Sequence, residues 1–508
     1  MLYNKCMNEG NFPNELKTGK ISPIYKKDNE DLLENYRPVS TLAIFGKIFE
    51  KIIFSRLYSF MTSQKILYEN QFGFRKQHST NHAINYSVTH IKKLTREKNH
   101  VLGIFIDLSK AFDTISHEKL LCKLYKYGIR GNTHALIGSY LSNRKQYVSV
   151  LGENSDELSV LFGVPQGSVL GPLLFIIYIN DIYNSTDLGK FVLFADDTNI
   201  FVADKCKIKV FEKANKVLKS INDYMKCNLL HINIKKCCYM HFTSNRKEVT
   251  ADDDMLNLVL GQNVIKCVKE TKFLGVIIDN KLSWDAHIKY LNSKLKCEIG
   301  KLNRMKHVIP NELYKNLYLT LFESHLSYGI TAWGGVSKNL LKSLFTTQKK
   351  CIRIMFGDQD AYMAKFETCA RTRTFESRIL GREFFQREPS KPLFCNNSLL
   401  TVHNLYKYHC IVEMFKVVKL RIPISIYELM KRSRRRDNYF ISLHPSSLFD
   451  YQASNFWNKC RKPSSTIDFT TSINIVKTVL KKALLETQNR YDTHVWHEFN
   501  FDTDHFSF

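Results

Sequence analysis

Two apolar segments that end on aspartate constrain the fold of this chain most. Val101–Ile106 (VLGIFI) is rich in branched side chains and is followed directly by Asp107. Phe191–Phe194 (FVLF) and Asn199–Ala203 (NIFVA) flank a second acidic point, the pair Asp196-Asp197. Short apolar runs of this composition are typical of buried strands. The pattern therefore predicts a buried strand and a hairpin, each with carboxylates at its end.

Adjacent carboxylates at a hairpin tip carry an electrostatic cost, because like charges repel and burial disfavours the charged form. A divalent cation would relieve that repulsion. Two oxygen-ligated Mg²⁺ ions about 4 Å apart are the known arrangement for in-line phosphoryl transfer. An ordinary Asp-Asp turn is the alternative that the hairpin alone leaves open. The apolar flanks favour the metal interpretation, since they place the pair at the rim of a buried sheet.

Periodicity and turn residues predict further elements along the chain. Two segments that flank a polar ENSDE turn predict a hairpin, and after about residue 280 the pattern becomes helical. The expected helices are Ala43–Met61, Thr80–Glu97, His117–Tyr127 and Lys207–Cys227; the expected hairpin strands are Gln146–Val150 and Leu158–Phe162; a further strand is expected over Lys272–Ile278.

Length and charge narrow the class of protein. A chain of 508 residues predicts two to four domains, and 44% hydrophobic residues suffice for a buried core. The formal net charge of +26 indicates a polyanionic partner, most simply nucleic acid, although a merely basic soluble protein remains an alternative. No run of eighteen apolar residues and no apolar leader is present, so we expect neither membrane insertion nor secretion. Thirteen cysteines without a spaced framework predict reduced thiols in an intracellular protein.

Seven sequence blocks then follow one another in a recognisable order. Five of them are FIDLSKAFDTI (Phe105–Ile115), GVPQGSVLGPLLF (Gly163–Phe175), FADD (Phe194–Asp197), LHINIKKC (Leu230–Cys237) and FLGVIID (Phe273–Asp279); NYRPVS (Asn35–Ser40) and QFGFRKQHST (Gln71–Thr80) precede them. This series resembles motifs A to E and the finger motifs of reverse transcriptases. The variant is similar to that of Jockey-type non-LTR retrotransposons, over about residues 7 to 345.

The resemblance implies a fold and an activity. The fold class would be α+β, a right-hand polymerase with fingers, a palm built on an antiparallel sheet and a helical thumb. We expect fingers and palm over residues 1–280, the thumb over 281–345, and a helix-rich basic C-terminal domain without an assigned role over 346–508. The activity would be RNA-directed DNA polymerisation, with an RNA template, a DNA primer and dNTPs as partners and substrates.

The resemblance also implies the residues of the catalytic centre. Asp107, Asp196 and Asp197 would hold two Mg²⁺ ions, with Mn²⁺ as an alternative ion. Lys236 matches the motif D lysine and is a candidate general acid for pyrophosphate, with Lys235 as the rival assignment.

Other residues would contact the nucleotide. Phe112 stands where the family places its steric gate against a ribose 2′-hydroxyl, although core packing alone would also account for this ring. Gln166 would be the polar contact of the Gly- and Pro-rich turn, and Asp113 a hydrogen-bonding support. Arg75 and Lys76 would contact the triphosphate.

Residues expected at the primer and template come from three places. They are Arg37, Gly167 and the hairpin Phe273, Leu274 and Gly275. For the basic side chains, a solvated surface without a ligand is the alternative. These roles follow from the resemblance and not from spacing.

The same resemblance sets expectations about what surrounds the polymerase. We expect the chain to be the C-terminal part of a second reading frame, with endonuclease activity outside it and no RNase H carboxylates after residue 345. It would work in the nucleus, the cytoplasm or both, as a ribonucleoprotein, and its oligomeric state stays open. The basic cluster LMKRSRRR (Leu429–Arg436) could track nucleic acid, direct nuclear import or form a solvated loop. Rival functions are an inactive RNA-binding remnant, an RNA-templated RNA polymerase and a maturase-like splicing helper.

Overall fold

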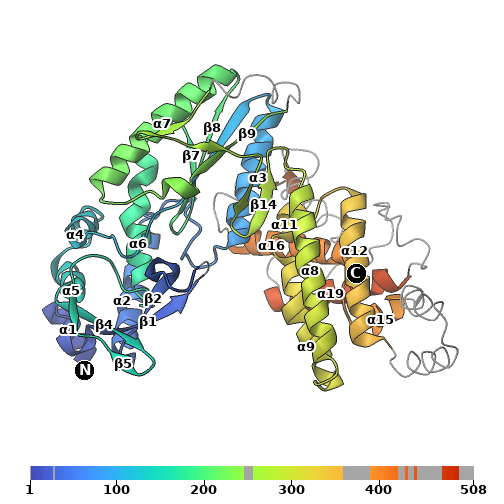
Figure 1. The fold of residues 1–508 in the computed structure, drawn as a ribbon, viewed down its shortest axis with the longest axis horizontal. Coiled ribbons are helices and arrows are strands. Elements are labelled where there is room, and N and C mark those ends of the chain that lie inside the picture. The colour runs from blue at the N-terminus through green and yellow to red at the C-terminus, as the bar shows by residue number, and fades with distance from the viewer. Residues whose placement is uncertain are drawn as a thin grey trace. The chain divides into compact units, whose positions relative to one another are not determined.

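Two compact units make up the chain. The computed structural model describes residues 2–26, 29–244, 256–357, 390–420, 430–432, 440–442 and 472–490 (Figure 1). The first unit comprises Met1–Ser79 and Leu94–Val268, and the second comprises Thr80–Lys93 and Lys269–Phe508. The second unit thus begins earlier than the expected division at 280 and takes in a helix from far upstream. The division at 345 stays a prediction.

A five-stranded sheet is the centre of the first unit. Its strand order is β12-β9-β3-β8-β7, and the pairs are antiparallel except β12 with β9. The expected buried strand and the expected acidic hairpin are both confirmed. The strands are β3 (His100–Ile106), β7 (Lys190–Phe194), β8 (Asp197–Asp204), β9 (Cys238–Phe242) and β12 (Lys266–Cys267).

Helices bury the central strand completely. Every residue of β3 is buried, and α7 (Lys207–Cys227) packs against both β3 and β8 (Figure 1). In the same unit, α6 (Gly171–Ile179) packs against α4 and is buried at almost every position, because it is a nearly unbroken apolar run. Gly103 in mid-strand leaves room for two large rings: a Cβ there would lie 2.9 Å from Phe242 and 3.3 Å from Phe201.

A second sheet lies in the same unit, with strand order β2-β1-β4-β5 and β6 paired to β4. Because β1 runs parallel to β4, residues near 20 lie beside residues near 147. The expected hairpin around ENSDE is confirmed for β4 and β6, but its loop contains a further short strand, β5. Bounds are β1 (Thr18–Tyr25), β2 (Tyr36–Thr41), β4 (Arg144–Val150), β5 (Glu153–Asn154) and β6 (Leu158–Val160), with α1 (Leu2–Glu9), α2 (Ile44–Ser63), α4 (His117–Lys126) and α5 (Gly131–Leu141).

The second unit is mainly helical. In it α8 packs against α12, and α16 packs against α11 and α19. The segment expected as one strand over Lys272–Ile278 is instead a hairpin, because Leu274 and Gly275 adopt positive φ angles that reverse the chain. Bounds are α3 (Thr80–Arg96, in the second unit up to Lys93), β13 (Glu270–Phe273), β14 (Val276–Asp279), α8 (Asp285–Met305), α11 (Ile330–Trp333), α12 (Lys338–Phe356), α15 (Ser390–Asn396), α16 (Val402–Leu420) and α19 (Ile473–Arg490).

The cysteines, the helix lengths and the basic cluster can also be compared with what the sequence predicts. Across the part of the chain that the structure describes, the cysteines carry free thiols. No helix among those same residues is long and apolar enough to cross a bilayer. The LMKRSRRR cluster falls mostly outside the described residues, apart from the short strand β15 (Met430–Arg432), which pairs with β16 (Phe440–Ser442).

The buried helix α3 carries polar side chains that find partners within its unit. Asn85 donates from Nδ2 to the Thr331 hydroxyl at 3.0 Å, and His82 pairs with the carboxylate of Glu413 on α16. Burial alone would raise the pKa of Glu413, but His82 and Lys416 outweigh it and lower that pKa to about 2. The charged carboxylate is therefore stabilised by folding.

We expect Glu413→Gln to destabilise the protein in a pH-dependent manner. Because the folded pKa of Glu413 lies below its ordinary value, its stabilisation is complete above pH 4.5 and is lost as the pH falls toward 2. The gap in thermal midpoint between wild type and variant, measured from pH 6 downward, should narrow over that range. The exposed Glu312, changed to Gln, serves as the control. A gap that stays constant with pH would contradict this account.

Candidate active site

Strand register brings the predicted carboxylates to one edge of the central sheet. Ile106, the last residue of β3, pairs with Thr198 on β8. Because the two strands are antiparallel, the next positions, Asp107 and Asp197, lie opposite each other at the same edge of the sheet. Asp196 sits in the tight β7–β8 connection, where Ala195 adopts a φ of +56°. Such a conformation is uncommon for alanine and needs support from its surroundings.

The QFG segment of the chain supplies that support. The Oε1 atom of Gln71 accepts hydrogen bonds from the N–H groups of Ala195 (3.1 Å) and Gly73 (2.9 Å). The Phe72 N–H donates to the Leu193 carbonyl at 2.8 Å. This bond holds the QFG segment alongside β7. A Cβ at Gly73 would lie 2.1 Å from the Ala195 nitrogen. Gln71 and Gly73 thus hold the acidic turn, a role that the sequence reasoning missed although the QFGF motif signalled the site.

Burial and repulsion between carboxylates raise the pKa values of the adjacent aspartates Asp196 and Asp197. Burial, Asp196 and Asp107 together raise the pKa of Asp197 to about 6. Burial also raises the pKa of Asp196, against the opposing effect of Arg37 and Lys236. All three carboxylates therefore belong to one electrostatic cluster that positive charge stabilises.

Lys236 provides part of that positive charge. Its Nζ atom lies 2.8 Å from Oδ2 of Asp107. Two backbone hydrogen bonds hold the segment before Lys236 beside the segment after β3. The Ser109 N–H donates to the His231 carbonyl (2.8 Å), and the Asn233 N–H donates to the Asp107 carbonyl (2.9 Å). Of the two rival lysines, Lys236 is thus the one beside the acidic cluster.

The donor set fits hard divalent cations, which prefer carboxylate oxygens. Within the described ranges, however, no three His, Cys, Asp or Glu side chains already form a ligand group. The pairing of Asp107 with Lys236 is consistent with that finding, because an ammonium takes up an oxygen that a metal would use. Ions would therefore have to draw the carboxylates together against this ion pair.

The structure gives the two basic residues of the GFRKQ motif local partners. Arg75 donates from one guanidinium nitrogen to the Tyr68 carbonyl (2.7 Å) and the Gln71 carbonyl (3.3 Å), and burial lowers its pKa. Lys76 is exposed, with its Nζ 5.4 Å from the centre of the Tyr58 ring. Arg75 thus shapes the loop that holds the acidic turn, and its expected contact with a triphosphate stays a prediction.

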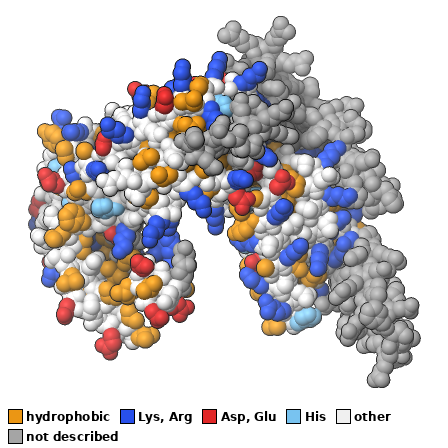
Figure 2. Space-filling view, turned by 45° about the horizontal axis from the view of Figure 1, so that its top comes forward, with side chains coloured by type: hydrophobic (Ala, Val, Ile, Leu, Met, Phe, Trp, Pro, Cys, Tyr) orange, Lys and Arg blue, Asp and Glu red, His pale blue; other side chains and the backbone are white. Residues whose placement is uncertain are grey.

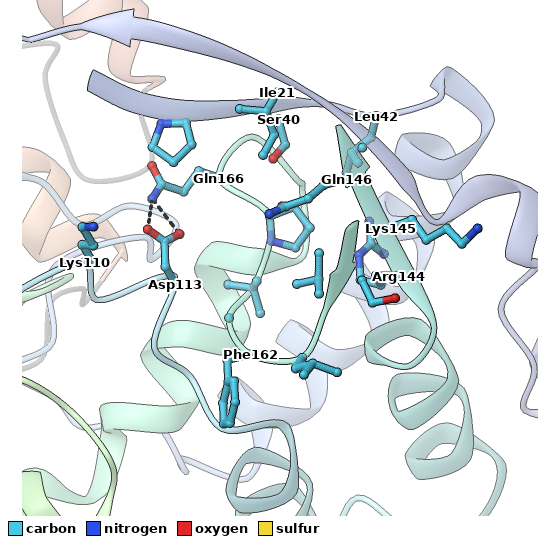
Figure 3. A pocket seen from close by; sticks show the side chains of 18 residues that line it. Ile21, Ser40, Leu42, Lys110, Asp113, Arg144, Lys145, Gln146, Phe162 and Gln166 are labelled. Carbon is cyan, nitrogen blue, oxygen red and sulfur yellow. Dashed lines mark hydrogen bonds between the residues drawn. The ribbon is translucent and has the colours of Figure 1, made fainter. Parts of the chain in front are cut away.

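The residues expected around the nucleotide form a second cluster in the same unit. The half-buried Phe112 ring stacks on Phe175 with ring centres 4.9 Å apart. Figure 3 shows Gln166 and Asp113 pointing toward each other, and Gln166 Nε2 lies 3.0 and 3.1 Å from the two carboxylate oxygens. Burial raises the pKa of Asp113 against the effect of this hydrogen bond. The predicted support by Asp113 is therefore present.

Two glycines allow the Gln166 turn to pack this closely. Gly163 (φ +84°) and Gly167 (φ +119°) both lie in the left-handed region. A Cβ at Gly163 would lie 2.8 Å from the Asp113 backbone, and one at Gly167 would lie 2.5 Å from the Ser40 carbonyl oxygen. The turn therefore packs directly against both the loop after β3 and strand β2, and only residues without a Cβ fit at these two positions.

A cavity of about 370 Å³ opens between this turn and the second sheet. Figure 3 shows it lined by side chains from β1, β2 and β4 as well as from the turn. Arg144 in its wall is buried and lies over the Tyr140 ring at 4.8 Å. Besides Arg144, the cavity lining residues with polar or charged side chains are Ser40, Lys110, Asp113, Lys145, Gln146, Ser159 and Gln166.

The remaining predicted residues lie on strand β2 and on the β13–β14 hairpin. Arg37 is exposed on β2, where its charge counteracts the raised pKa of Asp196. Phe273, Leu274 and Gly275 form the tip of the β13–β14 hairpin in the second unit.

Comparisons with known proteins show the family to which the chain belongs. Residues 24–278 match the family model described as "Reverse transcriptase (RNA-dependent DNA polymerase)". The chain belongs to the reverse transcriptase family. It is 28% identical over 365 residues to the probable RNA-directed DNA polymerase from transposon BS of Drosophila melanogaster, and 26% identical over 368 residues to that from mobile element jockey of the same species.

Each of these alignments covers 70% of this chain but only 40% and 39% of the relatives, so the chain spans about 40% of their length. Among solved structures, apo telomerase from Candida tropicalis is similar with a TM-score of 0.39 and 11% identity, covering 81% of this chain and 67% of that one. Telomerase from Candida albicans with a telomeric RNA fragment also gives 0.39, at 13% identity, covering 72% and 67%.

We expect Gly73→Ala to distort the acidic turn. The new Cβ would overlap the Ala195 nitrogen, and overpacking of this kind costs about 1–3 kcal/mol of unfolding free energy. Chemical denaturation of the full chain measures the change. Gly138→Ala in α5 is the matched control, because its Cβ would meet Leu121 only at 3.8 Å. Equal effects of the two substitutions would show that Gly73 does not support the turn.

Proposed function

We propose that this chain is the RNA-directed DNA polymerase of a non-LTR retrotransposon and extends a DNA primer on an RNA template with dNTPs. The observation that carries the proposal is the β3–β8 register, which puts Asp107 beside the Asp196-Asp197 turn within the region of the reverse transcriptase family match. Buried carboxylates with raised pKa values in such a cluster are typical of a functional site.

The reaction joins the primer 3′-hydroxyl to the α-phosphate of a dNTP, and pyrophosphate leaves as the bond between the α- and β-phosphates breaks. Asp107, Asp196 and Asp197 would hold two Mg²⁺ ions; when bound, these would lower the pKa of the attacking hydroxyl and neutralise charge on the leaving group. Lys236 would exchange its ion pair with Asp107 for a contact with the leaving pyrophosphate. From there its ammonium can donate a proton.

The nucleotide would lie against Phe112 and Gln166. Because the Phe112 ring is fixed on Phe175, it presents a rigid edge that a ribose 2′-hydroxyl would meet. Asp113 engages the Gln166 nitrogen, which leaves the amide oxygen as the free hydrogen-bonding end. Arg75 and Lys76 are the proposed triphosphate contacts, with Arg75 acting through the loop that it shapes.

The right-hand description of the fold also belongs to this proposal. The central sheet of the first unit would be the palm, the second sheet part of the fingers, and α8 part of the thumb. The cavity beside Gly167 and strand β2 would accept the template, and the β13–β14 tip would contact the primer. Arg37 on β2 is near enough to the acidic turn to serve either the template or the triphosphate.

Charge supports a nucleic-acid partner. The chain carries 74 Lys and Arg against 48 Asp and Glu. Figure 2 shows Lys and Arg side chains over much of the face that it presents, interspersed with apolar ones. Binding through phosphate neutralisation is independent of base sequence and weakens with salt. This suits an enzyme that must move along its template.

We expect Asp196→Asn to abolish primer extension. Loss of a carboxylate that holds the catalytic metals should reduce the rate at least about 10²–10³-fold, the size of effect seen when one preorganised transition-state contact is removed. The assay uses purified full chain, an oligonucleotide-primed RNA template, dNTPs and Mg²⁺. Asp204→Asn is the control, because Asp204 lies at the opposite end of β8 and pairs with Lys213. Absence of extension by the wild type at any Mg²⁺ or Mn²⁺ concentration would favour the inactive remnant.

Phe112→Val should relax sugar discrimination. Removing the ring opens space for a 2′-hydroxyl, so the preference for dNTPs over rNTPs should fall at least about tenfold, a change of 1.4 kcal/mol. The ratio of kcat/KM for the two substrates is the readout, and it does not depend on the amount of folded enzyme. Phe112→Tyr keeps the ring and serves as control. A valine variant with unchanged discrimination would mean that Phe112 only packs, and equal use of rNTPs by the wild type would favour the RNA polymerase alternative.

A further inference from the structure

The tip of the β13–β14 hairpin has an unusual backbone that depends on outside support. Phe273 pairs with Val276, and the two residues between them, Leu274 and Gly275, have φ angles of +44° and +89°. A two-residue turn with both φ angles positive matches the twist of a hairpin, but it disfavours a branched residue such as leucine. Something must therefore hold this turn in place.

Tyr328 contacts the turn directly. Its hydroxyl donates a hydrogen bond of 2.6 Å to the Leu274 carbonyl, across 54 positions of sequence. Its ring covers Gly275, where a Cβ would lie 2.9 Å from Cε1 of the tyrosine. The next residue, Gly329 (φ +66°), packs so closely that a Cβ there would lie 2.9 Å from a Val276 methyl.

Buried aromatic residues fix Tyr328 from behind. The indole nitrogen of the fully buried Trp333 donates to the Tyr328 carbonyl at 2.8 Å. His287 on α8 packs its ring against Trp333 at 5.7 Å, and its Nδ1 accepts a hydrogen bond from the Ile277 N–H at 3.3 Å. Burial lowers the pKa of His287 to about 4, so the imidazole is neutral and able to accept. Both the turn and strand β14 are thereby tied to the same aromatic group.

We propose that Tyr328 is a positioning residue that presets the β13–β14 turn for the 3′ end of the primer. The inference rests on the proposed function, which assigns primer contacts to Phe273, Leu274 and Gly275. A turn held in one conformation before binding avoids the ordering cost at the moment of binding. Tyr328 and Trp333 both belong to the segment HLSYGITAWGG, at positions 325–335.

Tyr328→Phe tests the proposal, because it removes one hydroxyl and keeps the ring over Gly275. Tyr314→Phe is the matched control: its hydroxyl donates at 2.8 Å to the Lys306 carbonyl in the same unit, outside the β13–β14 turn. Fluorescence anisotropy measures the Kd of each full-length variant for a primed RNA template and for the same RNA without primer. Hydrogen exchange of the peptide covering 270–279 reports on the turn itself.

We expect Tyr328→Phe to raise the Kd for primed template about 3- to 10-fold, the effect of one lost hydrogen bond. Exchange in the hairpin should become faster, whereas the Kd for unprimed RNA and the KM for dNTPs should not change. Tyr314→Phe should match the wild type in all these measurements. Faster exchange with an unchanged primed-template Kd, or an equal loss of affinity for primed and unprimed RNA, would overturn the proposal.

Binding measurements separate this proposal from the proposed function. If the wild type binds primed template but does not extend it, the polymerase activity fails while the comparison of Kd values still decides the role of Tyr328. If the wild type binds primed and unprimed RNA equally, the positioning role is wrong as well.

Discussion

The antiparallel pairing of β3 with β8 is the interaction on which the candidate active site depends. It is a backbone ladder in which β3 is buried throughout, and its register is fixed because a one-residue slip would turn every side chain to the opposite face. That register brings Asp107 beside the Asp196-Asp197 turn, where burial and repulsion raise the pKa values of Asp196 and Asp197. The apolar core thereby stabilises an arrangement that the carboxylates alone would oppose.

Close backbone contacts support this arrangement at several points. Gly73 against Ala195, Gly163 against Asp113 and Gly167 against Ser40 each lie where a Cβ would overlap the neighbouring backbone. In the second unit, a Cβ at Gly275 or Gly329 would instead overlap a side chain, that of Tyr328 or of Val276. Each of these glycines lies in a turn or loop that packs directly against a segment far away in the sequence. The glycines are needed for the approach of these segments rather than for flexibility.

The ion pair between Lys236 and Asp107 links the acidic cluster to its proposed chemistry. A lysine that neutralises a carboxylate before metal binding limits the cost of the buried charges. The same lysine lies where the resemblance expects a proton donor for the leaving group. The two proposed roles of Lys236 are compatible, because Asp107 would no longer need the ammonium as a counter-charge once the three carboxylates held divalent cations.

Much of the fold was predictable because apolar periodicity and β-branched runs report directly on burial. The strand before Asp107, the acidic hairpin and the helix Lys207–Cys227 appear where the pattern predicts them. The short strand β5 had no local signal, because it depends on pairing with β4. At Lys272–Ile278 the local pattern predicted one strand, and only the family resemblance indicated the hairpin that the positive φ angles of Leu274 and Gly275 form. The transfer of Thr80–Lys93 to the second unit left no local signal, because contacts such as Asn85 with Thr331 join distant segments.

The sequence by itself determined which side chains are acidic, aromatic or glycine and in which order the motifs follow, and this sufficed for the family and the candidate carboxylates. Tertiary structure decided what each side chain touches: Arg75 binds carbonyl groups of its own loop, Gln71 supports the acidic turn, and Tyr328 meets the tip of the β13–β14 hairpin. The physical reason is that composition and spacing report on burial and local conformation, whereas a hydrogen-bond partner far along the chain is set only when the strands and helices pack.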